Sequence, residues 1–199
     1  MPEWRWDGST YRDETGREVA PERVYELVLE SIRRSEDAVA ELARLLTEGK
    51  LSLADWRRLM RETIKDEYVA FFLLGFGGLL LEEDVRQLVQ LLAEQYAYLD
   101  QFVVQMGEGL PSNAQIIARS RSYIRSAGSA FWVATYDAVT RGGMTEVKWT
   151  MNPAEHCEDC IRFAGMGWQP IEDNPYNGAV PRSGDTQCLF NCLCVLEFG

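Results

Sequence analysis

Apolar side chains recur at spacings of three, four and seven residues along most of the first 143 positions, which is the period of amphipathic α-helices. The first such stretch opens at Pro21, a residue that the first turn of a helix tolerates, and runs to about Thr47. Gly49 then ends the helix, and Ser52 with Asp55 forms a capping pair for the next one. We therefore expect two long helices joined by a short turn.

The same period predicts two more helices. An acidic run at residues 82–84 suits the positive end of a third helix, which reaches about Met106. Ser112 or Asn113 can cap a fourth helix, which stops at Gly142. This last helix has small side chains at its middle, as expected where helices cross closely. Four long helices on short connections predict a helical bundle.

The pattern changes after the fourth helix. Val147, Trp149 and Met151 alternate with polar residues, which is the period of a strand with one buried face. Asn-Pro and Asn-Gly pairs punctuate the remainder and indicate short strands and turns. The predicted fold class is mainly α, with an N-terminal helical bundle at residues 20–143 and a small C-terminal α+β module at residues 144–199.

Residues 1–19 show no helical period and predict an extended arm rich in aromatic side chains. Trp4 and Trp6 are its candidate partner contacts. Either these aromatic side chains pack on the core of the same chain, or the arm grips a neighbouring subunit, because a chain end stays ordered only when it is tied down.

Composition is that of an ordinary soluble globular protein, with 46% hydrophobic and 26% charged residues. The formal net charge of −11 argues against a protein that coats nucleic acid, because phosphate binding needs clustered lysine and arginine. The N-terminus lacks the apolar core of a signal peptide. The longest apolar run, residues 69–81, is too short to span a membrane. We expect a cytosolic product.

One segment of the chain is basic. Residues 110–150 carry a charge of +3, and Arg119, Arg121 and Arg125 lie in it on the fourth helix. Arg121 and Arg125 share a face at four-residue spacing. They form either a solvated stripe that pairs with the acidic helices of the bundle, or a contact with an acidic partner surface or with packaged DNA.

All five cysteines fall in the last 43 residues, as Cys157-Glu-Asp-Cys160 and, after 27 residues, Cys188, Cys192 and Cys194. Two short-spaced cysteine groups joined by a loop are what a tetrahedral metal ion requires. A reducing compartment and an odd cysteine count both disfavour disulfides. The sequence therefore predicts a zinc-ribbon-like module, in which a structural zinc ion supplies the folding free energy that a short tail cannot obtain by burial alone.

The ligand set is partly open. Cys157, Cys160 and Cys188 are the predicted ligands, and the fourth is either Cys192 or Cys194, which would point to the same side of an extended segment. The only histidine adjoins Cys157, and we expect it to be exposed or to support a ligand, because neighbouring side chains of an extended segment diverge.

No catalytic constellation stands out, so the sequence predicts a protein that is not an enzyme. Cys-His catalysis needs a base, and the single histidine adjoins a cysteine of metal-binding type. Most carboxylates lie at solvating spacings on helix faces, and no Ser/His/Asp arrangement or phosphate-binding glycine loop is present.

The C-terminal part resembles the cysteine module of the tailed-phage minor head proteins, the Mu F-like or head morphogenesis family. That module runs as a strand, a C-x-x-C turn, a loop with Pro and Gly, and a cysteine before a C-x-C strand. The matching segments are Glu146-Val-Lys-Trp149, Cys157-Glu-Asp-Cys160, Pro181 to Gly184, and Cys188-Leu-Phe-Asn-Cys192-Leu-Cys194. The helical part is also similar to short members of phage head gene clusters, through residues 49–56, 75–78, 95–99 and 118–123. Leu193 departs from the family, since many members have arginine there.

The resemblance implies a low-copy structural protein of the virion, synthesised in the host cytoplasm and built into the head near the portal vertex. It would assist head assembly, DNA packaging or ejection. The implied partners are the portal protein, the major capsid protein, packaged DNA, and further copies of the chain around the portal, with no membrane partner. The alternative is a soluble zinc-ribbon adaptor or regulator that binds nucleic acid or protein in the cytoplasm.

Overall fold

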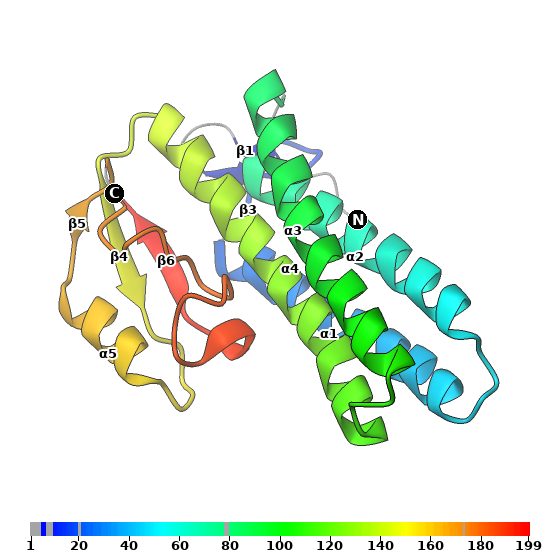
Figure 1. Cartoon of the computed structure of the whole chain (residues 1–199). Coiled ribbons are helices and arrows are strands. Elements are labelled where there is room, and N and C mark those ends of the chain that lie inside the picture. Colours follow the sequence, from blue (N-terminus) through cyan, green and yellow to red (C-terminus); the bar gives the residue numbers. More distant parts are fainter. Residues whose placement is uncertain (1–4, 7–9, 20, 78–79, 173) are drawn as a thin grey trace.

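A computed structural model describes residues 5–6, 10–19, 21–77, 80–172 and 174–199 of the chain. Four long helices lie side by side, and a smaller part containing strands packs on one flank of them (Figure 1). The predicted fold class, mainly α with a bundle followed by a small α+β module, is confirmed. None of the described helices combines the length and the apolar character that crossing a membrane requires.

The four helices begin and end close to the predicted residues. Ser52 caps the second of them, where its hydroxyl accepts a hydrogen bond from Asp55 N at 3.1 Å. Ser112 caps the fourth in the same way and forms a reciprocal pair with Gln115. These N-caps set where the two helices begin, because they satisfy backbone N–H groups that have no partner in a first turn. The bounds are α1 (Pro21–Thr47), α2 (Leu53–Phe76), α3 (Glu82–Gly107) and α4 (Asn113–Arg141).

Helix α4 is the central helix and packs against both α1 and α2. Its middle turns bury small side chains, including Ala127, Ala130 and Ala134, as the sequence predicts for close crossings. At Gly75 of α2 a Cβ atom would lie only 2.2 Å from the backbone oxygen of Phe131. The α2–α4 crossing is therefore close enough to exclude any side chain at Gly75.

Helix α3 packs against α2 and contacts its neighbours through an aromatic pair and a buried ion pair. The ring of Phe102 meets Trp56 of α2 edge to face, with 6.2 Å between the ring centroids. At the start of α3, the fully buried carboxylate of Asp84 accepts hydrogen bonds from Leu81 N at 2.6 Å and from Arg141 at the end of α4. This ion pair joins the two ends of helices that are remote in sequence.

The N-terminal residues form a small antiparallel sheet in place of the expected extended arm. Tyr11 is buried against the bundle, and burial raises its pKa to about 12, while a hydrogen bond with Thr135 of α4 partly offsets the rise. Trp4 lies outside the described residues, and only the backbone of Trp6 is described, paired with Tyr11. The three strands are β1 (Arg5–Trp6), β2 (Tyr11–Arg12) and β3 (Glu18–Val19).

The C-terminal module is built on a second antiparallel sheet, whose central strand is the predicted one. Trp149 of that strand is fully buried and packs against Phe163 and Tyr176, at centroid distances of 5.1 and 5.2 Å. The module thus has an aromatic core of its own, which the expectation of a tail ordered by metal alone did not include. The elements are β4 (Glu146–Thr150), α5 (Glu158–Gly165), β5 (Gln169–Pro170), the 3-10 turn η1 (Leu189–Asn191) and β6 (Val195–Phe198).

Candidate metal centre

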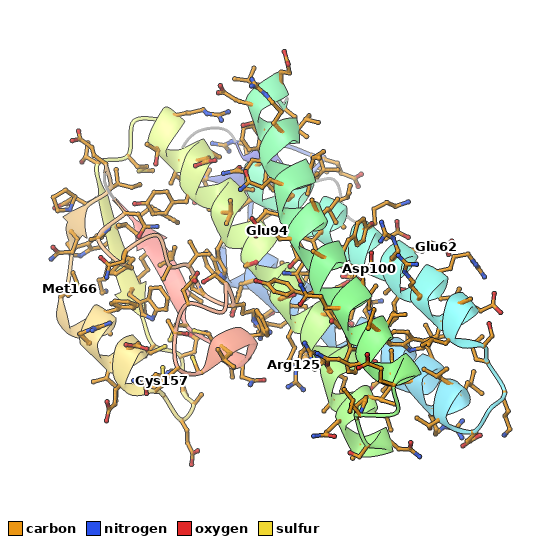
Figure 2. The ribbon with its side chains drawn as sticks, viewed as in Figure 1. Glu62, Glu94, Asp100, Arg125, Cys157 and Met166 are labelled. Atoms are coloured by element: carbon orange, nitrogen blue, oxygen red, sulfur yellow. The ribbon has the colours of Figure 1, made fainter. Side chains whose placement is uncertain are left out.

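Two turns of the module bring the cysteines together. Cys157 is the N-cap residue of α5 and Cys160 lies in its first turn, so the C-x-x-C segment is the start of a helix that the sequence analysis did not predict. Cys188 and Cys192 bracket η1 on the other side of the site, and Cys194 directly precedes β6. Figure 2 shows Cys157 at the beginning of α5, on the flank of the module.

The Sγ atom of Cys160 lies at the centre of the cluster. It is 3.6 Å from Cys157 Sγ, 3.6 Å from Cys188 Sγ and 3.7 Å from Cys192 Sγ. Four sulfurs bound at about 2.3 Å to one tetrahedral zinc ion lie about 3.8 Å apart, so these three distances suit the edges of such a tetrahedron. The cluster could therefore hold a metal ion: the Sγ atoms of Cys157, Cys160 and Cys188 all lie within 4.8 Å of one another, and Cys192 is close to Cys160.

Cys194 belongs to a second grouping that includes the histidine. His156 Nδ1 lies 3.5 Å from Cys194 Sγ, and both lie within 4.8 Å of Cys160 Sγ. His156 Nε2 donates a hydrogen bond to the carbonyl oxygen of Asn152 at 2.7 Å, and Nδ1 faces the sulfur of Cys194. The expectation was an imidazole that is exposed or supports a ligand; His156 is half-buried and contacts Cys194, although it does not diverge from the cysteines as the spacing suggested.

The five cysteine thiols differ in the direction in which their pKa values are shifted. Hydrogen bonding by Cys194 lowers the pKa of Cys192 to about 6, and the same contact, together with burial, raises the pKa of Cys194. Burial raises the pKa of Cys188 to about 11 and also raises the pKa of Cys160. Burial acts in the same direction on Cys157, but the backbone N–H of Cys160 and the contacts with Cys188 outweigh it and lower its pKa. Cys192 and Cys157 are thus the sulfurs most ready to become thiolates, the form that binds metal.

Asp159 joins the two turns that carry the cysteines. Its carboxylate accepts a hydrogen bond at 3.0 Å from the backbone N–H of Gln187, the residue before Cys188. The same carboxylate forms an ion pair with Arg162 at 2.9 Å. The Thr186 hydroxyl lies 3.2 Å from Cys188 Sγ. Such contacts orient ligands before a metal arrives. Asp159 was not among the predicted site residues. Two acidic residues between Cys157 and Cys160 could have indicated the start of a helix, because acidic side chains are favoured in a first turn.

The cluster is also in contact with the helical bundle. The Tyr25 hydroxyl of α1 donates to the backbone oxygen of Cys194 at 3.4 Å. Arg182, in the loop before the third cysteine, is 95% buried by this packing and donates to the backbone oxygen of Phe190 at 3.3 Å. Burial raises the pKa of Tyr25, and the nearby charge of Arg182 partly offsets the rise. Arg182 was not predicted either, although a basic residue stands out in a tail whose charge is −5.

The three arginines predicted to contact a partner lie apart from the cysteine cluster. Arg125 pairs with Glu36 of α1 and donates to Asn191 Oδ1 of η1 at 2.7 Å, and Figure 2 shows it between the bundle and the module. Arg121 faces Asp37 of α1 at 3.9 Å. Both therefore have carboxylate partners on an acidic helix of the same bundle. This is the arrangement described by the first of the two alternatives, a solvated stripe that pairs with acidic helices.

Arg119 differs from the other two. Its guanidinium stacks over the ring of Phe102 at 4.6 Å from the centroid and donates to Gln105 Oε1 at 3.3 Å. No carboxylate of the described chain lies within ion-pair distance of it. Of the three predicted arginines, Arg119 keeps the most capacity for a further contact.

Known proteins offer no match from which a role for this site could be transferred. No family model matches the chain, and neither a curated protein nor a solved structure does so.

Proposed function

We propose that the cysteine cluster holds one structural zinc ion, with Cys157, Cys160, Cys188 and Cys192 as its ligands. The observation that carries this proposal is the set of three sulfur distances of 3.6–3.7 Å around Cys160. A zinc ion binds thiolates in tetrahedral geometry and leaves no coordination position open when four are present. Such an ion crosslinks α5 to the η1 turn and performs no hydrolysis.

On this basis the chain acts as a structural protein and not as an enzyme. Its work lies in surfaces presented by the bundle and by the zinc-held module. The closed ligand set supports this role, and so does the way in which Arg125 and Arg182 fasten the module to the helices. A module attached in this way holds its surface in a fixed position relative to the helices, as a structural protein that binds partners requires.

We further propose that the protein is a minor head protein of a tailed bacteriophage, located near the portal vertex and acting in head assembly, DNA packaging or ejection. The support is the resemblance of its cysteine module to that family, combined with the helical bundle in front of it. The partners on this proposal are the portal or major capsid protein, and the chain is made in the host cytoplasm before it enters the virion.

Two measurements test the proposal. Elemental analysis of the purified chain is expected to return about one zinc per molecule. Quantitative mass spectrometry of purified particles, from a host in which the chain is expressed with its flanking genes, is expected to find the chain at low copy number. Particles that lack it altogether would remove the virion assignment while leaving the zinc site untouched.

The cytoplasmic zinc-ribbon adaptor remains the second candidate, and the arrangement of charges favours a protein partner for it over nucleic acid. Arg125 pairs with Glu36, and Arg121 lies 3.9 Å from Asp37, so a phosphate would compete with a carboxylate at each of these arginines. A DNA shift assay across a salt series separates the two, because phosphate binding weakens steeply as salt rises.

A further inference from the structure

Two hollows adjoin along the outer face of α4, and they share Arg119, Ser122 and Phe190 in their walls. One has a volume of about 610 Å³ and the other of about 550 Å³. Helix α3 and the turn after it form one wall, and the loop of residues 178–191 in the module forms the other. We name the two together the α4 trough. It exists only because the module is docked on the bundle.

The larger half of the trough is apolar and open to solvent at its edges. Phe102, Pro111 and Phe190 line it, and the flanking leucines Leu110 and Leu189 are 68% and 51% exposed. Large aliphatic side chains left in solvent on both lips of a hollow are typical of protein-binding surfaces. This half of the trough suits apolar side chains of a partner.

The smaller half is lined by two carboxylates and by the shared guanidinium of Arg119, so one negative charge is in excess. Glu94 of α3 and Asp185 of the module line it from opposite walls, and neither has a cationic partner within ion-pair distance among the residues that the structure describes. Figure 2 shows Glu94 on α3 beside α4, whereas Glu62 lies on α2 away from this face. Tyr98 adds an exposed aromatic ring to the same wall. Carboxylates with an aromatic ring nearby are suited to a lysine or arginine side chain.

Tyr123 adds a polar group to the smaller half. Its side chain is 95% buried, and Arg119 is the neighbour that lies close to its hydroxyl, without a hydrogen bond of regular geometry between them. A buried hydroxyl without a regular hydrogen bond costs free energy, and a bound group can recover that cost. Burial raises the pKa of Tyr123, so it stays a neutral donor at physiological pH.

We propose that the α4 trough binds an extended segment of a partner protein, in which apolar residues adjoin a lysine or arginine. The apolar residues fill the larger half, and the basic side chain lies between Glu94 and Asp185. The Tyr123 hydroxyl and the remaining N–H groups of Arg119 hydrogen-bond to backbone oxygens of the segment. This inference rests on the proposed role as a structural protein that works through its surfaces, and it names the surface and the chemistry of the partner.

Selection from a random library of 12-residue peptides displayed on yeast tests the proposal. The zinc-loaded full chain is the bait, and Ser122→Trp is the counter-selection, because a tryptophan there fills the junction of the two halves. Enriched peptides are expected to carry apolar residues within about four positions of a lysine or arginine, the reach of an extended segment across the two halves. Zinc content and circular dichroism check that the Ser122→Trp chain is folded.

Fluorescence anisotropy with the most enriched peptide then measures the contribution of each part. Leu110→Glu, at a position too exposed to disturb folding, is expected to weaken binding about tenfold. Neutralising both carboxylates, with Glu94→Gln and Asp185→Asn, is expected to weaken it about fivefold, and less at high salt. The matched control, Glu62→Gln with Asp66→Asn, removes the same charge from α2 and is expected to leave the affinity within about twofold of the unmodified chain.

Tyr123→Phe separates a binding role from a structural one. Because the hydroxyl makes no hydrogen bond of regular geometry with its neighbour Arg119, its removal is expected to change the free energy of unfolding little while weakening peptide binding severalfold. Enrichment of acidic peptides, enrichment that Ser122→Trp does not abolish, or equal affinity for Leu110→Glu and the unmodified chain would each overturn the proposal. Zinc content and the presence of the chain in particles are read out separately, so failure here leaves those two proposals standing.

Discussion

Gly128, in the middle of α4, lies directly against the buried side chain of Arg182 from the C-terminal module. A Cβ atom at Gly128 would come within 2.5 Å of Arg182 Cδ and 3.2 Å of Ile32 Cδ1. The glycine therefore provides the space in which the module's only deeply buried arginine among the described residues meets the bundle. Docking of the module depends on the absence of a side chain at this one position.

The Gly128→Ala substitution is expected to destabilise the protein by about 1–2 kcal/mol. Overpacking of a filled site costs about 1–3 kcal/mol, while the gain in helix propensity returns up to about 1 kcal/mol. Chemical denaturation measures the change, and hydrogen exchange in residues 181–190 reports whether the loop has moved. Gly107→Ala is the control, because nothing lies within 4 Å of its Cβ position and only the propensity gain applies. A Gly128→Ala chain as stable as the unmodified protein would contradict the argument.

A larger effect is expected at Gly75. Its added Cβ would meet the backbone oxygen of Phe131 at 2.2 Å, and a backbone atom cannot rotate away as a side chain can. Gly75→Ala must push α2 from α4 and is expected to cost about 3 kcal/mol or more. The midpoint of urea unfolding, compared with that of Gly128→Ala, gives the ranking, and the reverse order would show that the α2–α4 crossing is looser than described.

The cysteines are expected to differ in their effect on zinc content. Cys160→Ser removes the sulfur that lies within 3.7 Å of three others and is expected to abolish stoichiometric binding. Cys194→Ser is expected to retain about one zinc per chain, because its sulfur pairs with His156 and lies outside the proposed ligand set. Elemental analysis after removal of free metal measures both. Loss of zinc from Cys194→Ser with retention in Cys192→Ser would exchange their roles.

Zinc loss is expected to loosen the module without unfolding the helices. The bundle buries large apolar side chains on its own helices, such as Trp56 and Phe72, and the module retains the packing of Trp149 on Phe163 and Tyr176. Chelation should therefore lower hydrogen-exchange protection in residues 157–194 first. Complete unfolding of α1 to α4 on chelation would show that the two parts form a single cooperative unit.

The Asp84–Arg141 pair predicts acid sensitivity. Hydrogen bonds from Arg141 hold the pKa of Asp84 below its usual value, against the opposing effect of burial. A lowered pKa in the folded state means that the stabilisation is present above the unfolded value of about 3.9 and is lost as the pH falls through the folded value. Asp84→Asn is expected to cost about 1–2 kcal/mol at pH 7 and progressively less below about pH 4.

Unfolding curves of Asp84→Asn and of the unmodified chain at several pH values measure this difference. Both chains lose the stability contributed by the metal site as acid protonates its ligands, so this loss cancels in the difference between them at each pH. Glu83→Gln is the control, because Glu83 is exposed and contacts the same arginine at 3.3 Å. A difference that stays constant from pH 7 to pH 3 would mean that the ionised carboxylate of Asp84 does not contribute.

The sequence by itself determined the four long helices and the grouping of the cysteines. Ser52 was predicted as one N-cap and Ser112 or Asn113 as another; Ser52 and Ser112 are the N-caps observed, because a cap depends on residues only three positions apart. The strand around Trp149 follows from alternation over five residues. Signals of this kind are local, so the chain carries them whatever its tertiary structure.

Only the tertiary structure decided which side chains meet. It placed His156 beside Cys194, paired Arg125 with Glu36, and buried Arg182 against Gly128, a residue 54 positions away. It also turned the C-x-x-C segment into the start of α5, a helix of eight residues that is too short for its period to be recognised. These outcomes depend on how the module docks on the bundle, because contacts between distant parts of a chain are set by packing and not by local spacing.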